Sequence, residues 1–257
     1  MFHLLFVFLS LLLTSNSYGV VAVTLNASML NQLGYNNAST SINIYSSNID
    51  DIDPNTFKGY TNLTSLTMQS CGFKQVDLGL FKDLTSLKIL DLSFNPLTQL
   101  TNPKKISFPF LHYLILNNCP LISLDQNVIN GTPNLTSFSI ENDVQFYQLK
   151  TNQLSGWKNL IDLSLAIKNQ TSLTKAHFNG LNRLNDLAIR YGNIKTIEVH
   201  TFFGLSSLTS LDLSGNQLTS FEYLQIPSQL NALYLQLNKL NYFLNCFALF
   251  NKIKHFF

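Results

Sequence analysis

The stretch LKILDLSFNPLTQL, residues 87–100, decides the fold of this chain. Its apolar residues follow the spacing Leu-x-x-Leu-x-Leu-x-x-Asn-x-Leu-x-x-Leu, which returns in LTSLDLSGNQLTSF at 208–221 and in LNALYLQLNKLNYF at 230–243. Nine such units follow one another, and seven of the eight intervals between their first residues are 24 or 25 residues long. A fixed period in this range predicts a solenoid of stacked coils. The units begin at Ser39, Leu63, Leu87, Leu111, Leu135, Leu160, Leu184, Leu208 and Leu230.

Each unit contains a Leu-x-Leu core that alternates with period two, as a short strand with one buried face does. Position 9, counted from the first residue of the unit, lies at the turn after this strand, where buried backbone groups need hydrogen-bond partners. Asn95, Asn216 and Asn238 fill this position in three units, and Cys71 and Cys119 fill it in two others. Position 19 is expected to fill the core from the opposite side of the coil. It holds Phe57, Phe81, Phe178 and Phe202, with Ile129 and Ile226 in place of Phe in two further units.

A single unit cannot fold alone. Its five or six apolar side chains each gain about 1.5–3 kcal/mol on full burial, whereas ordering the backbone costs about 1–2 kcal/mol for every residue. Stacking lets each unit bury its faces against two neighbours, so stability belongs to the array.

These spacings resemble the extracellular leucine-rich repeat family, in the 24-residue type with the Phe position that Toll-like receptor ectodomains, Slit-like proteins and small leucine-rich proteoglycans share. The resemblance covers residues 39–243. It implies an α/β-type leucine-rich repeat solenoid of about nine repeats. In this fold a curved, parallel β-sheet forms the concave face, and irregular or short helical segments form the convex face.

The ends of the chain predict three further segments. The apolar run Leu4–Leu13 has the length of a signal-peptide core and is too short to cross a bilayer. Ser17 and Gly19 suit cleavage before Val20, so 1–19 is read as a signal peptide, with a buried N-terminal helix as the alternative. Residues 20–38 form an N-terminal cap, 39–243 the solenoid, and 244–257 a C-terminal cap or the end of a truncated longer protein.

Both caps lack the Cys-rich sequence that often closes such solenoids. We expect Leu25, Met29, Leu30 and Leu33 to cover the first unit, with a degenerate strand at Val21–Val23. At the other end, the sequence allows either a short capping helix or the end of a truncated longer protein. The apolar residues of such a helix have helical spacing and are Cys246, Leu249, Phe250, Ile253 and Phe257.

Six Asn-x-Ser/Thr sequons fit an extracellular compartment. They begin at Asn26, Asn37, Asn62, Asn130, Asn134 and Asn169. Three cysteines do not make a disulfide framework. Cys71 and Cys119 hold the same position two units apart, which places their Cα atoms about 10 Å apart at a strand spacing of 4.8 Å. That exceeds the disulfide limit of about 7 Å, so both are expected to be buried thiols that do not bridge each other.

No catalytic or metal-binding pattern is present in the sequence. His112 is expected on the concave surface and His177 and His200 on the convex surface, none at metal or triad spacing. There is no Gly-rich phosphate loop, His-Glu-x-x-His or Gly-x-Ser-x-Gly. We therefore expect no enzyme activity, no cofactor and no metal. Without a basic cluster or a long apolar segment, we expect no nucleic-acid partner and no membrane span beyond the signal peptide.

The remaining sequence evidence for function is the chemistry of the predicted concave surface. Positions 2, 3, 5, 7 and 8 of each unit should face out of the concave sheet or lie at its rim. They hold two cations and five anions, a net charge of −3, on a chain of net charge +2. These are Lys88 and Arg190, and Asp91, Glu141, Asp162, Asp186 and Asp212.

Two clusters on this face are candidate ligand-binding residues, because exposed apolar patches often mark interaction sites and Tyr and Arg are enriched in binding hot spots. The alternative is that single aromatics on a repeat surface are ordinary. The first cluster is Ile89, Tyr113 and Ile115, and the second is Ile167, Arg190 and Tyr191.

The fifth unit departs from the pattern, since Gln145 and Gln148 stand where apolar residues are expected. A register slip of one residue would bring Val144, Phe146 and Leu149 inward instead.

The sequence thus predicts a secreted, non-enzymatic binding protein that recognises a protein or glycan through its concave face. The alternatives are a truncated ectodomain of a membrane receptor and an extracellular-matrix structural protein.

Overall fold

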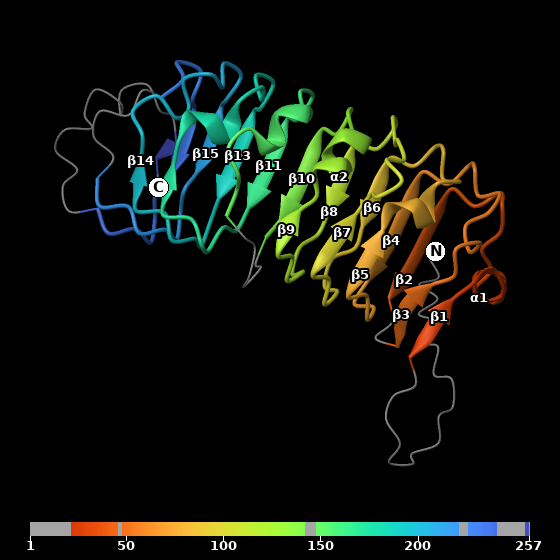
Figure 1. The fold of residues 1–257 in the computed structure, drawn as a ribbon. Helices are drawn as coiled ribbons and strands as arrows, with labels where there is room; N and C mark the ends of the chain where they lie inside the picture. Colours follow the sequence, from red (N-terminus) through yellow and green to blue (C-terminus); the bar gives the residue numbers. More distant parts are fainter. Residues whose placement is uncertain (1–21, 46–47, 142–147, 221–225, 241–254, 257) are drawn as a thin grey trace, which may run out of the picture.

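The coils stack in chain order along one axis in a computed structural model of the protein, with N- and C-terminal coils at opposite ends (Figure 1). The structure describes residues 22–45, 48–141, 148–220, 226–240 and 255–256. The residues of the expected signal peptide lie outside these ranges, as do Gln145, Val144 and Phe146.

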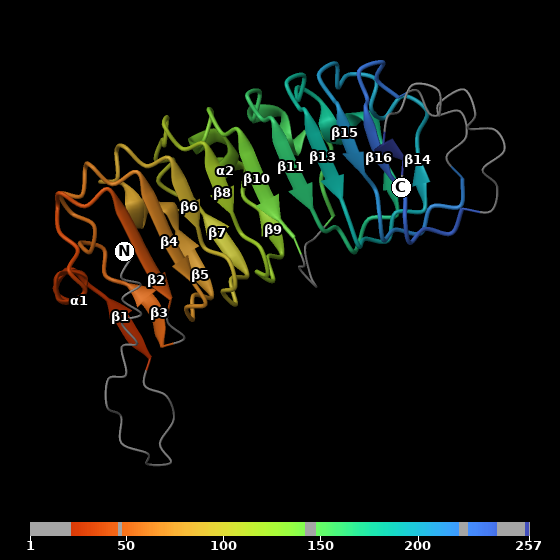
Figure 2. The same cartoon turned by 180° about the vertical axis from the view of Figure 1, so that it is seen from behind.

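One parallel sheet runs the length of the solenoid (Figure 2). It is the sheet that the repeat pattern predicts on the concave face, and it is hereafter called the concave sheet. Within the described residues it has ten strands in chain order. They are β2 (Ser41–Tyr45), β4 (Ser65–Gln69), β6 (Ile89–Asp91), β8 (Tyr113–Ile115), β10 (Ser137–Ile140), β11 (Asp162–Leu165), β13 (Asp186–Ile189), β15 (Ser210–Asp212), β16 (Ala232–Tyr234) and β17 (His255–Phe256).

Shorter elements complete each coil on its other sides. The remaining strands form three small parallel sheets, β1–β3, β5–β7–β9 and β12–β14, and single turns of helix lie on the convex side. The strands are β1 (Val23–Leu25), β3 (Ile49–Ile52), β5 (Gln75–Asp77), β7 (Gln99–Thr101), β9 (Ser123–Leu124), β12 (Ser172–Leu173) and β14 (Thr196–Ile197). The helices are α1 (Ala27–Gln32), η1 (Leu78–Phe81), α2 (Gln126–Gly131), η2 (Gln153–Gly156) and η3 (Lys175–Phe178).

The predicted repeat register is confirmed by the strand pairing. Position 3 of one unit pairs with position 3 of the next, as Ser65 with Ile89 and Ile89 with Tyr113. Positions 4 and 6 point into one continuous core while positions 3, 5 and 7 face outward, so β4 alternates between half-buried and buried residues. This alternation is what a strand with one buried face requires.

The Phe positions form a second layer of the core, as predicted. Phe57 and Phe81 are buried with ring centroids 5.6 Å apart, and Phe178 and Phe202 are buried with centroids 5.8 Å apart. Ile129 is fully buried in the same role. Two pairs of neighbouring convex turns are therefore joined by contact between their Phe rings.

The Asn side chains at position 9 satisfy backbone carbonyls at the turn after the strand in their units. Asn216 Nδ2 donates to the carbonyls of Ile189 (2.7 Å) and Leu213 (2.9 Å), and Asn238 Nδ2 donates to Leu213 and Leu235. In the fourth unit the buried Cys119 Sγ performs part of this task by donating to the Leu92 carbonyl at 3.2 Å. A thiol can therefore replace Asn at position 9 because one of the carbonyls still finds a donor.

The two ends differ in detail from the sequence expectation. Leu25 and Leu30 are fully buried and Met29 packs partly against the core, whereas Leu33 is only half-buried. The N-terminal strand is Val23–Leu25 rather than 21–23, and it pairs with β3 instead of extending the concave sheet. At the other end, residues 255–256 add a strand beside β16, so a capping helix extending through this point is wrong. Cys246, Leu249, Phe250, Ile253 and Phe257 lie outside the described residues.

In the fifth unit, the described part agrees with a slipped register. Leu149 is buried and Gln148 is exposed. Gln170 of the next unit holds this segment in place, because its Oε1 accepts the Leu149 N–H at 3.0 Å.

Candidate ligand-binding face

The outward positions of the concave sheet form straight rows across the strands. The row at position 3 contains Ile89, Tyr113, Ser137, Asp162 and Asp186, each in register with the next. Because adjacent strands lie about 4.8 Å apart, neighbouring members of the row are close enough to contact the same ligand.

The acidic half of this row opens into a hollow on β10 to β16. Its volume is ≈ 490 Å³, and its polar lining comes from Glu141, Asp162, Ser164, Asp186, Arg190, Ser210, Asp212 and Tyr234. Four carboxylates and one guanidinium thus meet in one depression of the concave face.

Arg190 is held at the centre of the hollow by two ion pairs. Its Nε donates to Asp212 Oδ2 at 2.5 Å and its Nη1 to Glu141 Oε1 at 2.8 Å. Glu141 lies two units away, and the buried Ala166 occupies the same position in the intervening unit. Burial lowers the pKa of Arg190, but Asp212 and Glu141 raise it by more, so the pKa lies above the ordinary value. Arg190 therefore ties the fifth, seventh and eighth units together, and much of its hydrogen-bonding capacity is already used.

Asp162, which is exposed, and Asp186, which is half-buried, form the rest of the acidic lining of the hollow. They pair in register on β11 and β13. Burial raises the pKa of Asp162, and the neighbouring Asp186 carboxyl raises it further. Asn185 donates to Asp186 Oδ2 at 2.6 Å. Asp91, by contrast, is a buried acid whose carboxylate accepts from Gln69 Nε2 and the Ser93 N–H, so it offers little to a ligand.

The structure places the first predicted cluster on one surface. Tyr113 is 44% exposed, and Ile89 and Ile115 are half-buried beside it on β6 and β8. Ile89 pairs in register with Tyr113, and Ile115 is the next outward residue of β8, so the three side chains lie on the same face of the sheet.

The second predicted cluster is only partly exposed. Tyr191 is 54% exposed at the rim, but Ile167 is fully buried and cannot meet a ligand. At position 8 of other units the backbone has positive φ, which turns the side chain outward, as at Tyr191 (φ 50°) and Phe94 (φ 61°). Ile167 is not among the described residues with positive φ. A β-branched side chain disfavours that region, and here the side chain points into the core.

The same turn exposes apolar residues that sequence reasoning missed. Leu237 is 72% exposed and Phe94 54% exposed, both at position 8 with positive φ. Gly215 holds this position in the eighth unit, and a Cβ there would lie 2.5 Å from the Tyr191 ring. The signal that could have found these residues is their shared position, since every large residue there except Ile167 is turned outward.

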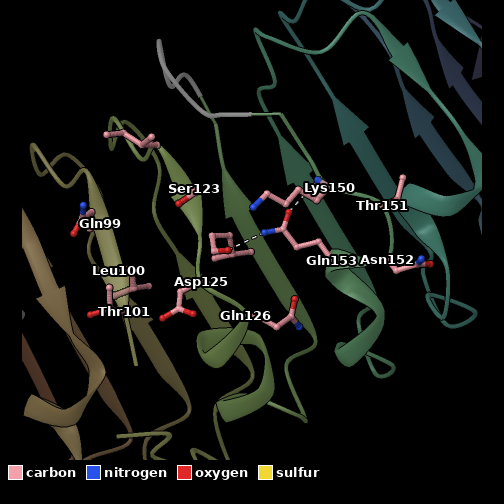
Figure 3. A pocket seen from close by; sticks show the side chains of 12 residues that line it. Gln99, Leu100, Thr101, Ser123, Asp125, Gln126, Lys150, Thr151, Asn152 and Gln153 are labelled. Carbon is pink, nitrogen blue, oxygen red and sulfur yellow. Dashed lines mark hydrogen bonds between the residues drawn. The ribbon is translucent and has the colours of Figure 1, made fainter. Parts of the chain in front are cut away.

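A second hollow lies away from the concave face, between β9 and the segment before η2 (Figure 3). Its volume is ≈ 530 Å³. Gln153 spans it, donating from Nε2 to the Leu124 carbonyl (2.8 Å) and accepting the Lys150 N–H at Oε1 (3.1 Å). Asp125 accepts the N–H groups of Asn102 and Asn127. Gln153 thus joins the irregular fifth unit to the fourth, and Asp125 joins the fourth unit to the third.

His177 is buried rather than on the convex surface, which corrects the sequence expectation. It is the third residue of η3, where its Nδ1 accepts the Thr174 N–H at 3.0 Å, and its Nε2 lies 2.8 Å from the Gln170 side chain. Glu or Gln usually takes this capping role. Here it places the His177 imidazole in the protein interior. Burial lowers the pKa of His177, although the Thr174 hydrogen bond and Glu198 oppose the shift. His112 is half-buried at the edge of the concave sheet, and His200 is exposed.

We expect acid to destabilise the protein through His177. A pKa below the ordinary value of about 6.5 means that the unfolded chain binds the proton more readily. Stability from this group is therefore complete above pH 6.5 and is lost as the pH falls from there toward the lowered pKa. In thermal melts, His177→Gln, which keeps a capping acceptor, should lose less stability than the wild type between pH 7.5 and 5.5. His200→Gln is the control, and an equal pH response of wild type and His177→Gln would contradict the assignment.

The six sequon asparagines all lie outside the strands of the concave sheet. Five of them are exposed: Asn37, Asn62, Asn130, Asn134 and Asn169. Asn26 is half-buried and caps α1 through its Oδ1. Glycans at these positions would leave the concave face uncovered.

The part of the chain that the structure describes contains no group of three or more His, Cys, Asp or Glu side chains that could hold a metal ion. None of its helices is long and apolar enough to span a membrane.

Comparison with known proteins agrees with the fold. A model of the leucine rich repeat matches residues 39–97 and 158–218. Lumican of Gallus gallus is 29% identical over 222 residues, which cover 82% of this chain and 49% of lumican. Toll-like receptor 3 of Boselaphus tragocamelus is 28% identical over 193 residues, 73% of this chain and 20% of the receptor. The chain thus spans about half the length of lumican.

Solved structures show the same architecture. A TLR13–ssRNA13 complex superposes with a TM-score of 0.60 at 27% identity, covering 86% of this chain and 28% of that chain. Internalin C2 of Listeria monocytogenes superposes with a TM-score of 0.58 at 20% identity, covering 79% of this chain and 82% of internalin C2. The repeat period of the chain, its solenoid and these matches together show that the chain is similar to extracellular leucine-rich repeat proteins, as its sequence predicts.

Proposed function

We propose that this protein is a secreted binding protein that recognises a protein ligand through its concave sheet. The observation that carries the proposal is the concave face itself, which combines an apolar patch at Ile89, Tyr113 and Ile115 with an acidic hollow of ≈ 490 Å³. Exposed apolar surface rimmed by polar groups marks interaction sites. A glycan ligand is the alternative occupant of the same face.

Secretion is supported by the apolar run Leu4–Leu13 and by the exposure of five sequon asparagines. We expect the chain to appear in the medium of a secretory eukaryotic cell and to gain mobility on treatment with an N-glycanase. A chain that stays in the cytosol with unchanged mobility would contradict this expectation.

Ligand binding should depend on the concave face and not on the convex one. Once a ligand is found by screening extracellular proteins, Tyr113→Ala should make the free energy of binding less favourable by about 2 kcal/mol or more. This corresponds to an increase in Kd of about thirtyfold. The matched control is Phe203→Ala, which removes an aromatic side chain 65% exposed near η3. If Phe203→Ala weakens binding and Tyr113→Ala does not, the concave assignment fails.

Arg190 is expected to act differently from Tyr113. Because its guanidinium already pairs with Glu141 and Asp212, Arg190→Ala should lower both binding and thermal stability, whereas Tyr113→Ala should lower binding alone.

The likeness to Toll-like receptor 3, of which the chain covers 20%, favours a second candidate, a piece of a receptor ectodomain. Extending the transcript beyond the codon for Phe257 distinguishes the two, because a transmembrane segment downstream would favour the receptor.

A further inference from the structure

The row at position 3 of the concave sheet carries two chemically different pairs at a fixed separation. Ile89 and Tyr113 form the apolar pair on β6 and β8, and Asp162 and Asp186 form the acidic pair on β11 and β13. Ser137 on β10 lies between them. At about 4.8 Å per strand, the centres of the two pairs lie three strands, or about 14 Å, apart.

The apolar pair is an exposed surface and not part of the core. Tyr113 is 44% exposed, and Ile115 extends the patch at the next outward position of β8. Ligand atoms placed here would remove apolar area from water, which favours binding.

The acidic pair lacks a compensating cation among the side chains that line its hollow. Arg190 is the cation of that lining, and it is engaged by Glu141 and Asp212. Asp162 and Asp186 therefore lie in register on adjacent strands, where two negative charges would repel each other. A cationic group from a partner would relieve this repulsion.

Resting on the proposed function, we propose that this row binds an extended segment of a partner protein that carries a bulky apolar residue and, four residues later, a Lys or Arg. In an extended chain, residues i and i+4 point to the same side and lie about 13 Å apart, which matches the separation of the two pairs. In a helix they would lie about 6 Å apart, too close to reach both. The residue at i+2 would face Ser137, where a small or polar side chain fits.

The test is selection of a phage-displayed library of random 12-residue peptides on the immobilised full-length chain at low salt. We expect the enriched peptides to share an apolar residue followed by Lys or Arg at the fourth position after it. The best peptide, made synthetically, should bind the Asp162→Asn/Asp186→Asn variant about tenfold or more weakly, and should lose this preference at high salt. Selection on that variant should retain the apolar position and lose the cationic one.

The matched control is Asp50→Asn/Glu198→Gln, which removes the same charge from exposed positions outside the row. Equal weakening by both double variants would overturn the proposal, because only net charge would then matter. The proposal would also be overturned if the enriched peptides had another spacing, or if no peptide were enriched. If the enriched peptides have another pattern but bind Tyr113→Ala more weakly, the proposed pairing of apolar and cationic residues is refuted, whereas ligand binding by the concave face is supported. Peptides that lose affinity only for Phe203→Ala would refute both.

Discussion

Leu213→Asp is expected to abolish cooperative folding of the solenoid. Leu213 is fully buried in the core of the eighth unit, between the stacked seventh and ninth units. The change deletes a buried Leu side chain, which alone costs about 2–5 kcal/mol, and adds a carboxylate with no partner in an apolar site. This approaches the whole stability of a domain, about 5–15 kcal/mol. Thermal melts followed by circular dichroism should show a large loss of stability or no folded protein.

The matched control for this change is Leu237→Asp in the next unit. Leu237 has the same side chain but is 72% exposed, and its φ of 58° lies in a region that Asp tolerates. We expect its melting temperature to stay close to that of the wild type. Equal losses in the two variants would show that the inward and outward positions have been assigned wrongly.

Asn216→Ala should have the second largest effect, because one side chain serves several buried backbone groups. Besides the carbonyls of Ile189 and Leu213, its Oδ1 accepts the Ile194 N–H at 3.2 Å. Leu213 O keeps a donor in Asn238, so the variant leaves the Ile189 carbonyl and the Ile194 N–H without this partner. At about 1–3 kcal/mol for each buried unsatisfied group, we expect the two groups to cost about 2–6 kcal/mol in denaturant unfolding.

Two further variants test the reason for this loss. Asn231→Ala removes an exposed Asn on the neighbouring unit and should change stability little. Asn216→Cys should be milder than Asn216→Ala, because Cys119 at the equivalent position donates to a strand carbonyl through its Sγ. If Cys and Ala at this site were equally destabilising, the hydrogen-bond explanation of the position would not hold.

The ion pairs of Arg190 connect binding to the architecture of the irregular fifth unit. Glu141 is the last described residue before 142–147, and it is held by both Arg190 and the Ser164 hydroxyl. The ion pairs in the acidic hollow therefore hold neighbouring units of the sheet together, and the same hollow is a candidate binding surface. Substitutions at Arg190 must be interpreted with a stability measurement alongside.

The sequence by itself determined the array, since a 24-residue period of apolar residues can bury its faces only by stacking. It also determined which residues face inward at positions 4 and 6, as Leu213 does, and which face outward at position 3, as Tyr113 and Asp162 do. These features follow from strand alternation and repeat spacing, which are local properties of the chain.

Only the tertiary structure decided the residues whose environment depends on backbone conformation or on distant partners. Ile167 turned inward because its backbone does not adopt the positive φ of equivalent positions. His177 became buried because its ring accepts the Thr174 N–H and meets Gln170. Arg190 became an internal link because Glu141, 49 residues away in sequence, lies beside it in the folded sheet. Periodicity specifies which side of a strand a residue occupies, whereas these three outcomes depend on turn dihedrals and on contacts that exist only after the coils have stacked.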